Sequence, residues 1–334
     1  MSKVQAGGKR REIFLAPRTE KLSDNSVNRQ QFEWGVSKPE AGIRLDRFLI
    51  ARLPTLSRRE LSDLIALRTV FVNGYPSRKG RHLTQGDIVR AHLHTRLSPN
   101  PRLDLAVLFA DEAFVAVDKP AGMPSLALRY AETVTVANFL VARFPETLSV
   151  GSAQREAGLV HRLDTDTSGV LVAARTSAAY THLRTHFNRR CVYKEYRAVV
   201  EGHFPHKDGF HFFLAPRGPH GRRMQVVQDA AAQEALATYV PLQSGADWTL
   251  VKIIIETGVR HQIRAHLSAL GYPIWGDRVY GSHVQKDALH LHAHVIAFRH
   301  SVSTGQARQI RIVSPLPKIF HCMPPDELGK GKAR

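Results

Sequence analysis

The side chains best suited to chemistry are His161, Arg162 and Asp164, which precede a turn of small residues at 166–169. The apolar run that follows, 170–174, has the length and branching of a buried strand. We therefore expect the Asp164 carboxylate at the edge of a loop with a rigid element behind it, a position from which a scaffold presents a charged group to a substrate. The alternative is a structural role, in which Asp164 caps the turn or pairs with Arg162.

Two further elements are expected to position side chains beside this turn. Residues 192–200 are rich in branched and aromatic side chains, and a strand there places Lys194 and Tyr196 on one face. A helix over 261–270 carries Arg264 near its start. By residue type alone, a tyrosine in a strand belongs to the core more often than to a site.

The charge of the chain indicates a polyanionic partner. Its 334 residues include 47 Lys and Arg against 29 Asp and Glu, a net charge of +18. This excess favours nucleic acid as the partner. A membrane surface would also attract it, but no run approaches the roughly 18 apolar residues of a spanning helix, and residues 1–40 lack the apolar core of a signal peptide. We expect a cytoplasmic protein that binds no membrane.

The composition predicts a globular protein of two domains. The chain is 43% hydrophobic and 23% charged, and it is long enough for one substantial core plus a smaller module. Its two cysteines, Cys191 and Cys322, form no CxxC pair and no zinc-like spacing, so they fit a reducing compartment and are interpreted as structural.

Three histidines alternate with apolar residues in the stretch LHLHAH at 289–294 and would share one face of a strand. A metal site is one interpretation of this pattern. Because no Cys or acidic ligand stands nearby at regular spacing, structural or RNA-facing histidines are the favoured interpretation, and no metal is expected.

Three motifs resemble those of the RluA-type pseudouridine synthases, enzymes that isomerise uridine to pseudouridine in ribosomal and transfer RNA. HRLDTDTSG resembles the family's HRLDxxTSG signature, which implies that Asp164 is the catalytic aspartate. KEYRA resembles KxYxA, in which the tyrosine, here Tyr196, stacks on the target base and its hydroxyl takes the proton from carbon 5. TGVRHQIRAHLSALGYPIWGDRVYG is similar to TGRxHQIRxHL...GxPxxGDxxYG, in which Arg264 matches the arginine that pairs with the aspartate.

The same resemblance implies further contacts with the substrate. Arg162 would fill the space that the target uridine leaves when it is extruded from its stack. Leu291 would line the base pocket, and His161 and Lys194 are further candidates for binding the substrate RNA, Lys194 in a supporting role. Neither a metal nor an organic cofactor is implied.

Two other positions bear on these motifs. Val259 stands where the family has arginine, and Arg260 keeps the charge count but would point in a different direction. The stretch KPAG at 119–122 looks like the family's KPxG loop, for which a structural turn is a better interpretation of Lys119 than a phosphate contact.

Residues 42–94 have the pattern of a compact module with two helices and two strands. Ser57 is a plausible N-cap, with Glu60 three residues later as in a capping box. A strand at 70–72 enters a tight Asn-Gly turn, and a last strand covers 88–91.

Through RLDRFL, LSRREL, VFVNG and GDIV, this module is similar to the RNA-binding domain named after small-subunit ribosomal protein S-four. Its expected basic face, with Arg44, Arg58 and Arg59, would position a phosphate backbone without reading sequence. Arg68 departs from the pattern, which usually has glycine before the strand, so the turn there is expected to differ.

We therefore expect an α+β protein: a pseudouridine synthase fold, with a mixed and mainly antiparallel sheet, flanking helices and a central catalytic cleft, plus a small α/β RNA-binding domain. The expected divisions are a basic, mobile arm at 1–40, the RNA-binding domain at 41–95, a linker at 96–106, the catalytic domain at 107–320 and a basic tail at 321–334.

The expected function is that of a monomeric RNA pseudouridine synthase, with large-subunit ribosomal RNA as the first substrate and transfer RNA as the second. By the resemblance, Asp164 either attacks the anomeric carbon of the sugar or removes a sugar proton. A non-catalytic RNA-binding or ribosome-assembly factor is the alternative, although it would have no reason to assemble Asp164, Tyr196 and Arg264. A nuclease would need an acidic metal cluster or paired histidines near a lysine.

Overall fold

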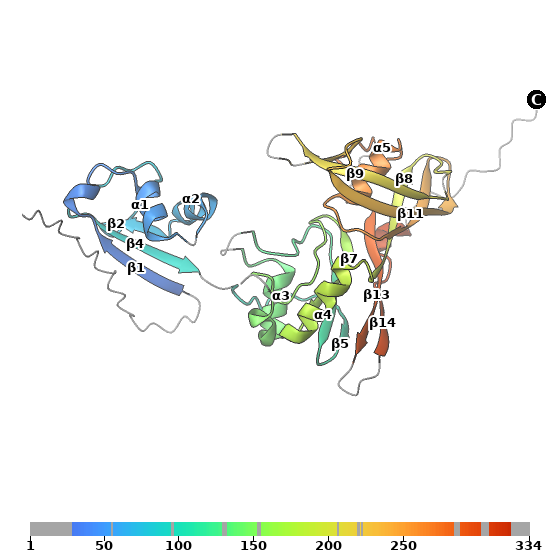
Figure 1. Ribbon diagram of the computed structural model, residues 1–334, viewed down its shortest axis with the longest axis horizontal. Coiled ribbons are helices and arrows are strands. Elements are labelled where there is room, and N and C mark those ends of the chain that lie inside the picture. Colours follow the sequence, from blue (N-terminus) through green and yellow to red (C-terminus); the bar gives the residue numbers. More distant parts are fainter. Residues whose placement is uncertain are drawn as a thin grey trace, which may run out of the picture. The chain divides into compact units, whose positions relative to one another are not determined.

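The structure is a computed structural model that describes residues 29–321, apart from short gaps at 55, 95–96, 129–131, 152–154, 206, 219–220, 222, 284–287 and 302–306. The chain divides into two compact units, residues 1–95 and 96–334 (Figure 1). No helix among the described residues is long and apolar enough to cross a membrane.

The smaller unit packs two helices on a four-stranded antiparallel sheet in the order β1-β4-β2-β3. Its elements are β1 (Arg29–Gly35), η1 (Lys38–Glu40), α1 (Leu45–Arg52), α2 (Arg58–Ala66), β2 (Val70–Val72), β3 (Tyr75–Pro76) and β4 (Ile88–His94). The predicted capping box starts α2, since the Ser57 hydroxyl accepts from the Glu60 N–H at 3.2 Å and the Glu60 carboxylate accepts from the Ser57 N–H at 2.9 Å. Arg68, where the pattern usually has glycine, has a φ of +57°.

The expected arm at 1–40 is wrong for its last twelve residues, because 29–35 form a strand and 38–40 a helical turn. Strand β1 pairs with β4 along its whole length. Trp34 is only 5% exposed, stacks on Phe32 and meets the ring of Phe48 edge-on. Two aromatic side chains at alternate positions thus extend the core of this unit. Residues 1–28, and 322–334 of the expected tail, lie outside the described part of the chain.

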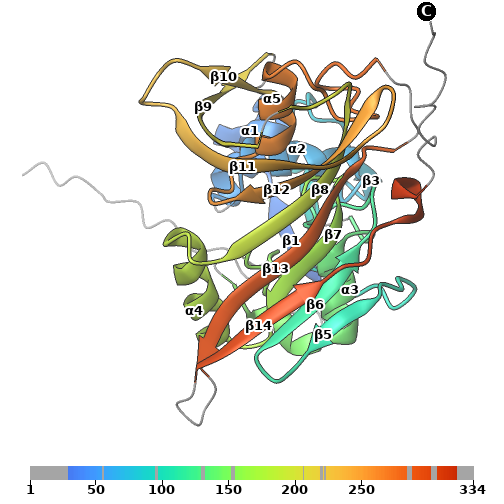
Figure 2. The same cartoon turned by 90° about the vertical axis from the view of Figure 1, so that its right-hand side faces the viewer.

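The larger unit is built on one ten-stranded mixed sheet in the order β10-β9-β11-β12-β8-β13-β7-β6-β5, with β14 paired to β13 (Figure 2). Its strands are β5 (Val107–Ala110), β6 (Phe114–Lys119), β7 (Ser168–Ala174), β8 (Tyr193–Glu201), β9 (Gly209–Arg217), β10 (Arg223–Val227), β11 (Gln233–Ser244), β12 (Trp248–Ile255), β13 (Leu291–Ser301) and β14 (Ala307–Val313). Every neighbouring pair is antiparallel except β13 and β7.

The helical elements of the larger unit are α3 (Val136–Arg143), η2 (Pro145–Ser149), α4 (Ser177–Asn188), α5 (Gln262–Ala269) and η4 (Lys318–Phe320). One hydrophobic core joins α3 and α4 to β6 and β7, and another joins α5 to β8, β11 and β12. Strand β13 lies between β7 and β8 and so links the two halves of the sheet. The α+β architecture is confirmed.

The expected linker at 96–106 belongs to the larger unit from Leu97 onward. Leu97 is fully buried and Leu105 is 5% exposed in the core that α3 and α4 cover. The Asn100 N–H also donates to the Asn138 carbonyl of α3 at 3.2 Å. The two prolines of this stretch do break regular structure, but leucines at its two ends anchor it to the core.

Gly169 allows β7 to start directly beside β13. Its φ is +117°, and a β-carbon at this position would lie 2.2 Å from the Ala293 carbonyl oxygen. No other residue fits both the conformation and the approach. The glycine of the signature therefore places the preceding residues, including Asp164, at the centre of the sheet.

The histidines at 290–294 have protein partners. His292 is fully buried, with Nδ1 at 2.9 Å from the Ser168 hydroxyl and Nε2 at 3.0 Å from the Ser314 hydroxyl. Because Ser314 donates to Asp118 at 2.8 Å, it accepts from His292, and Ser168 donates to the other ring nitrogen. Among the described residues, no group of three or more His, Cys, Asp and Glu is placed to hold a metal ion.

We predict that buried histidines make the larger unit sensitive to acid. Burial lowers the pKa of His161 to about 3 and those of His266 and His292 to about 4. These rings are neutral in the folded chain, and the unfolded chain binds their protons below a pKa of about 6.5, so the unfolding free energy should fall as pH falls. Near pH 5 the unfolded chain binds about three more protons than the folded chain, so the unfolding free energy should change by about 4 kcal/mol per pH unit.

Urea unfolding between pH 5 and 7.5 measures this slope, followed by the fluorescence of Trp248 and Trp275 in a Trp34→Phe background. His266→Asn should lower the slope by about one proton, and the same change at the exposed His321 should not. A slope that is equal in all three proteins would contradict the prediction.

Candidate active site

A cavity of about 80 Å³ in the larger unit brings together the residues that the motifs single out. Its walls come from the signature loop, β8, the turn after β12, the start of α5 and the start of β13. Five residues with expected roles line it: Arg162, Asp164, Tyr196, Arg264 and Leu291. They lie up to 129 positions apart in the sequence, so only the fold brings them together.

The Asp164 carboxylate faces two hydrogen-bond donors. Its Oδ2 lies 3.6 Å from Nη1 of Arg264 and 3.8 Å from Nε2 of His261, and the side chain is 27% exposed. It makes no ion pair with Arg162 within 4 Å among the described contacts, so the alternative structural pairing is not formed. The Asp164 carbonyl accepts from the Thr167 N–H at 3.1 Å, which closes the turn after it.

Arg264 is fixed from behind by Asp277, a residue to which the sequence analysis gave no role. Nε and Nη2 of Arg264 donate to the two Asp277 oxygens at 2.7 and 2.8 Å, and both side chains are buried. This bidentate geometry leaves Nη1 directed at Asp164. Although burial disfavours the charged form, hydrogen bonds and the charge of Asp277 raise the pKa of Arg264. The guanidinium is therefore a permanent cation beside the candidate catalytic carboxylate.

His261 is the second donor, and its ring is oriented by Tyr280. The Tyr280 hydroxyl accepts from the Met224 N–H at 2.8 Å and lies 3.0 Å from Nδ1 of His261. If the hydroxyl donates to Nδ1, the proton of a neutral ring is on Nε2, which faces Asp164. Burial lowers the pKa of His261 against the opposing charge of Asp164.

Tyr196 forms the aromatic wall of the cavity. It lies in β8, paired with Ile253 of β12 and Ala293 of β13. Burial, and then the charge of Asp164, raise the pKa of Tyr196, so its phenol stays protonated near neutral pH. Leu291 is 3% exposed at the start of β13 and gives the cavity an apolar surface.

Lys194 and Lys119 hold loops that border the cavity. Nζ of Lys194 donates to the carbonyls of Glu256 and Thr257 at 3.0 and 2.8 Å, and burial lowers the pKa of Lys194 to about 8. Nζ of Lys119 donates to three carbonyls, among them that of Thr165 at 2.8 Å, and burial lowers the pKa of Lys119 to about 8 against the charges of Asp166 and Asp164. Lys119 therefore ties its own turn to the loop that carries Asp164.

Two hydrogen bonds fix the residue before Asp164. The Ser125 hydroxyl donates to the Leu163 carbonyl at 2.8 Å and accepts from the Leu163 N–H at 3.1 Å. Ser125 is 4% exposed, so no water competes for these bonds. Together with Lys119, Ser125 restricts the movement of the candidate catalytic carboxylate.

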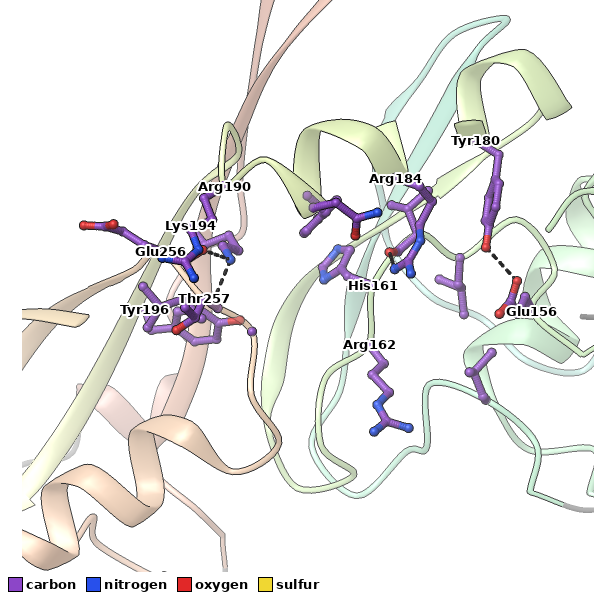
Figure 3. A pocket seen from close by; sticks show the side chains of 17 residues that line it. Glu156, His161, Arg162, Tyr180, Arg184, Arg190, Lys194, Tyr196, Glu256 and Thr257 are labelled. Atoms are coloured by element: carbon purple, nitrogen blue, oxygen red, sulfur yellow. Dashed lines mark hydrogen bonds between the residues drawn. The ribbon is translucent and has the colours of Figure 1, made fainter. Parts of the chain in front are cut away.

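A second cavity, of about 480 Å³, adjoins the first and shares Arg162, Tyr196, Ile255 and Gly258 with it (Figure 3). Arg162, which is exposed, lines both cavities. His161 lines only the larger one, where its ring stacks on Phe187 and its Nε2 accepts from the Val172 N–H at 3.1 Å. His161 therefore supports strand β7 and has no contact with Asp164.

The remaining predicted positions differ in environment. Val259 lines the smaller cavity, whereas Arg260 points away from it and donates to the Gly221 carbonyl beside β10. In the smaller unit, Arg44 pairs with Asp46 at 3.1 Å and Arg58 is the exposed first residue of α2. Arg59 also lies in α2, but its side chain is outside the described part of the structure.

Comparison with known proteins agrees with the motifs. A family model described as RNA pseudouridylate synthase matches residues 113–269. An uncharacterized RNA pseudouridine synthase of Mycobacterium bovis is 36% identical over 83% of this chain and 92% of its own. A ribosomal large subunit pseudouridine synthase D of Xylella fastidiosa is 33% identical over 83% of this chain and 87% of its own.

The fold comparison gives the same family. The solved structure of human RNA pseudouridylate synthase domain containing 1 is 25% identical, with a TM-score of 0.51, over 66% of this chain and 86% of that one.

We predict that Asp277→Asn lowers the rate of the reaction by about a hundredfold, because a displaced Arg264 no longer directs Nη1 at Asp164. It should also lower the unfolding free energy by about 3 kcal/mol, as expected when one partner of a buried ion pair is removed. Single-turnover kinetics of uridine isomerisation and urea unfolding measure the two effects. Asp247→Asn, at an exposed carboxylate outside both cavities, is the matched control. Wild-type kinetics in the Asp277 variant would refute this role.

Proposed function

The chain belongs to the RNA pseudouridylate synthase family, and from this premise we propose that it isomerises specific uridines of large-subunit ribosomal RNA, with Asp164 as the catalytic carboxylate. It is an RNA pseudouridine synthase and therefore an isomerase. The observation that supports the assignment of Asp164 is its position in the smaller cavity, 3.6 Å from a buried arginine and beside a tyrosine ring.

The reaction breaks the bond between the sugar and nitrogen 1 of uracil, turns the base and joins carbon 5 to the same sugar carbon. It needs no net redox change and no external nucleophile. A single carboxylate can initiate it in two ways, by attack on the anomeric carbon or by removal of a sugar proton. Both use the Asp164 carboxylate, whose Oδ2 lies 3.6 Å from Nη1 of Arg264.

Tyr196 is suited to hold the extruded base. An aromatic ring stacks on any base, and a stack of this kind compensates part of the cost of extrusion. Removal of the proton from carbon 5 completes the isomerisation, and the Tyr196 hydroxyl can accept it while passing its own proton to a base. Asp164 is the acidic residue that lines the same cavity.

Arg162 is proposed to occupy the position that the uridine leaves in the RNA. It is exposed, it stands two residues before Asp164, and it lines both cavities. A planar guanidinium can stack on the neighbouring bases and carries a charge that favours the phosphate backbone.

Large-subunit ribosomal RNA is the proposed substrate on two grounds. Relatives named ribosomal large subunit pseudouridine synthase D, from Xylella fastidiosa and Neisseria meningitidis, are 33% and 31% identical to this chain. The smaller unit presents exposed arginines that suit an RNA backbone, as its resemblance to the ribosomal-protein-S-four domain implies. The protein would then act in the cytoplasm.

One test of this proposal is Asp164→Asn, which keeps the size of the side chain and removes its charge. Isomerisation of in vitro transcribed large-subunit ribosomal RNA, followed by release of tritium from carbon 5, should become undetectable, while the Kd for that RNA stays within about twofold. Asp104→Asn, at an exposed carboxylate, should retain wild-type kinetics. Tritium release by the Asp164 variant would disprove the assignment.

Pseudouridine mapping in cells that lack the protein identifies the substrate RNA, and a loss confined to transfer RNA would replace the ribosomal proposal.

A second prediction concerns the smaller unit. Changing Arg44, Arg58 and Arg59 together to alanine should lower the slope of log Kd against log salt by about 2, since each neutralised phosphate of single-stranded RNA contributes roughly 0.7. Filter binding between 50 and 300 mM KCl measures the slope. An unchanged slope would show that these arginines do not contact the RNA backbone.

A further inference from the structure

A third cavity, of about 870 Å³, is lined by residues of α5 other than those that line the smaller cavity. It is bounded by the end of β9, by β10, by the last residues of α5 and by the turn at 278–281. Figure 2 shows β9 and β10 beside α5 at the edge of the sheet. We call this cavity the hairpin groove. None of its lining residues lines either cavity near Asp164, so it is a separate surface.

Three exposed arginines line the hairpin groove: Arg217 at the end of β9, Arg223 at the start of β10, and Arg278. Among the described residues that line it, none is acidic. In the part of the chain that the structure describes, no carboxylate pairs with any of the three, whereas Arg52, Arg175 and Arg197 each have one. The groove therefore has uncompensated positive charge, which favours a polyanion.

Hydrogen bonds connect the elements that form the floor of the groove and so fix the positions of these arginines. Tyr280 and Met224 are buried, and the Tyr280 hydroxyl accepts from the Met224 N–H at 2.8 Å. The Ser268 hydroxyl of α5 donates to the Tyr280 carbonyl at 2.8 Å, and the Arg217 guanidinium donates to the side-chain oxygen of Gln225. The hairpin, helix and turn thus form one surface.

Tyr280 also separates the groove from the smaller cavity. On one side it lines the groove. On the other its hydroxyl orients His261, and its ring lies 5.2 Å from the Arg264 guanidinium. The Tyr280 side chain therefore contacts the groove on one side and residues that line the smaller cavity on the other, so the two cavities are neighbours.

We infer that the hairpin groove binds the phosphate backbone of the RNA substrate next to the target uridine. This inference rests on the proposed function for the source of the RNA, but the binding site itself is defined by Arg217, Arg223 and Arg278. An RNA segment supplies the repeated negative charge that three separate guanidinium groups require, and a cavity of this volume falls in the range of built ligand sites.

The test is the triple variant Arg217→Ala/Arg223→Ala/Arg278→Ala of the full chain. We expect Kd for an in vitro transcript of large-subunit ribosomal RNA to rise at least tenfold, and the slope of log Kd against log salt to fall by about 2, from roughly 0.7 per phosphate. The control is Arg102→Ala/Arg143→Ala/Arg308→Ala, which removes the same charge from exposed positions of the same unit. Equal effects in both variants would overturn the inference, because net charge alone would then explain them.

A second variant separates binding from a structural role of the arginines. Arg217→Lys/Arg223→Lys/Arg278→Lys keeps the charges and loses the planar forks, so the salt slope should return to the wild-type value. Thermal unfolding checks that all variants fold. A lysine variant that binds as weakly as the alanine variant would overturn the inference.

The failure of the proposed function can be told apart from the failure of this inference. An oligouridylate of twenty nucleotides tests the groove without reference to any natural substrate. If the wild-type protein leaves ribosomal RNA unmodified but the alanine variant loses affinity for the oligonucleotide, the substrate proposal fails and the groove stands. If a poly-glutamate peptide competes as well as the oligonucleotide, the groove binds polyanions in general and the assignment to RNA fails.

Discussion

The site depends on a single buried arginine, Arg264, whose guanidinium lies between two carboxylates. Asp277 takes two of the guanidinium's donor nitrogens, and the third faces Asp164. A lone arginine beside Asp164 could rotate toward water or toward phosphate, and a lone carboxylate buried near it would be costly. The structure avoids both outcomes by giving the cation a permanent partner. In the proposed reaction Asp164 would change its bonding, while the cation beside it remains fixed by Asp277.

The backbone around Asp164 is fixed by equally local means. Gly169 permits β7 to begin against β13, Ser125 bonds both sides of Leu163, and Lys119 bonds the Thr165 carbonyl. Each of these contacts lies within a few residues of the carboxylate. A catalytic group must be held within a fraction of an ångström to be effective, and three independent contacts on one short loop meet that requirement.

Much of this arrangement could be predicted from the sequence. The motifs placed Asp164, Tyr196, Arg264, Arg162 and Leu291 around one cavity, and the periodic patterns gave the helices and most of the strands. The roles of Asp277 and His261 could not be predicted, although both stand in quoted motifs. Asp277 is recognisable as a partner only once the turn at 277–280 folds back on α5, and His261 only once Tyr280, nineteen residues later, reaches its ring. Strand β1 was missed because its partner, β4, lies more than fifty residues away and its own sequence is largely polar.

Strand β13 has a consequence for how the protein chooses uridines. It is bonded to β8 on one side and to β7 and β14 on the other, so the walls that carry Asp164 and Tyr196 belong to one continuous sheet. Opening the space between them would require breaking that sheet. The conformational change that brings the uridine to Asp164 must therefore occur in the RNA. Uridines in hairpin loops, bulges and other weakly stacked places can be extruded at a low free-energy cost. The protein can therefore discriminate by the deformability of the RNA as well as by its base sequence.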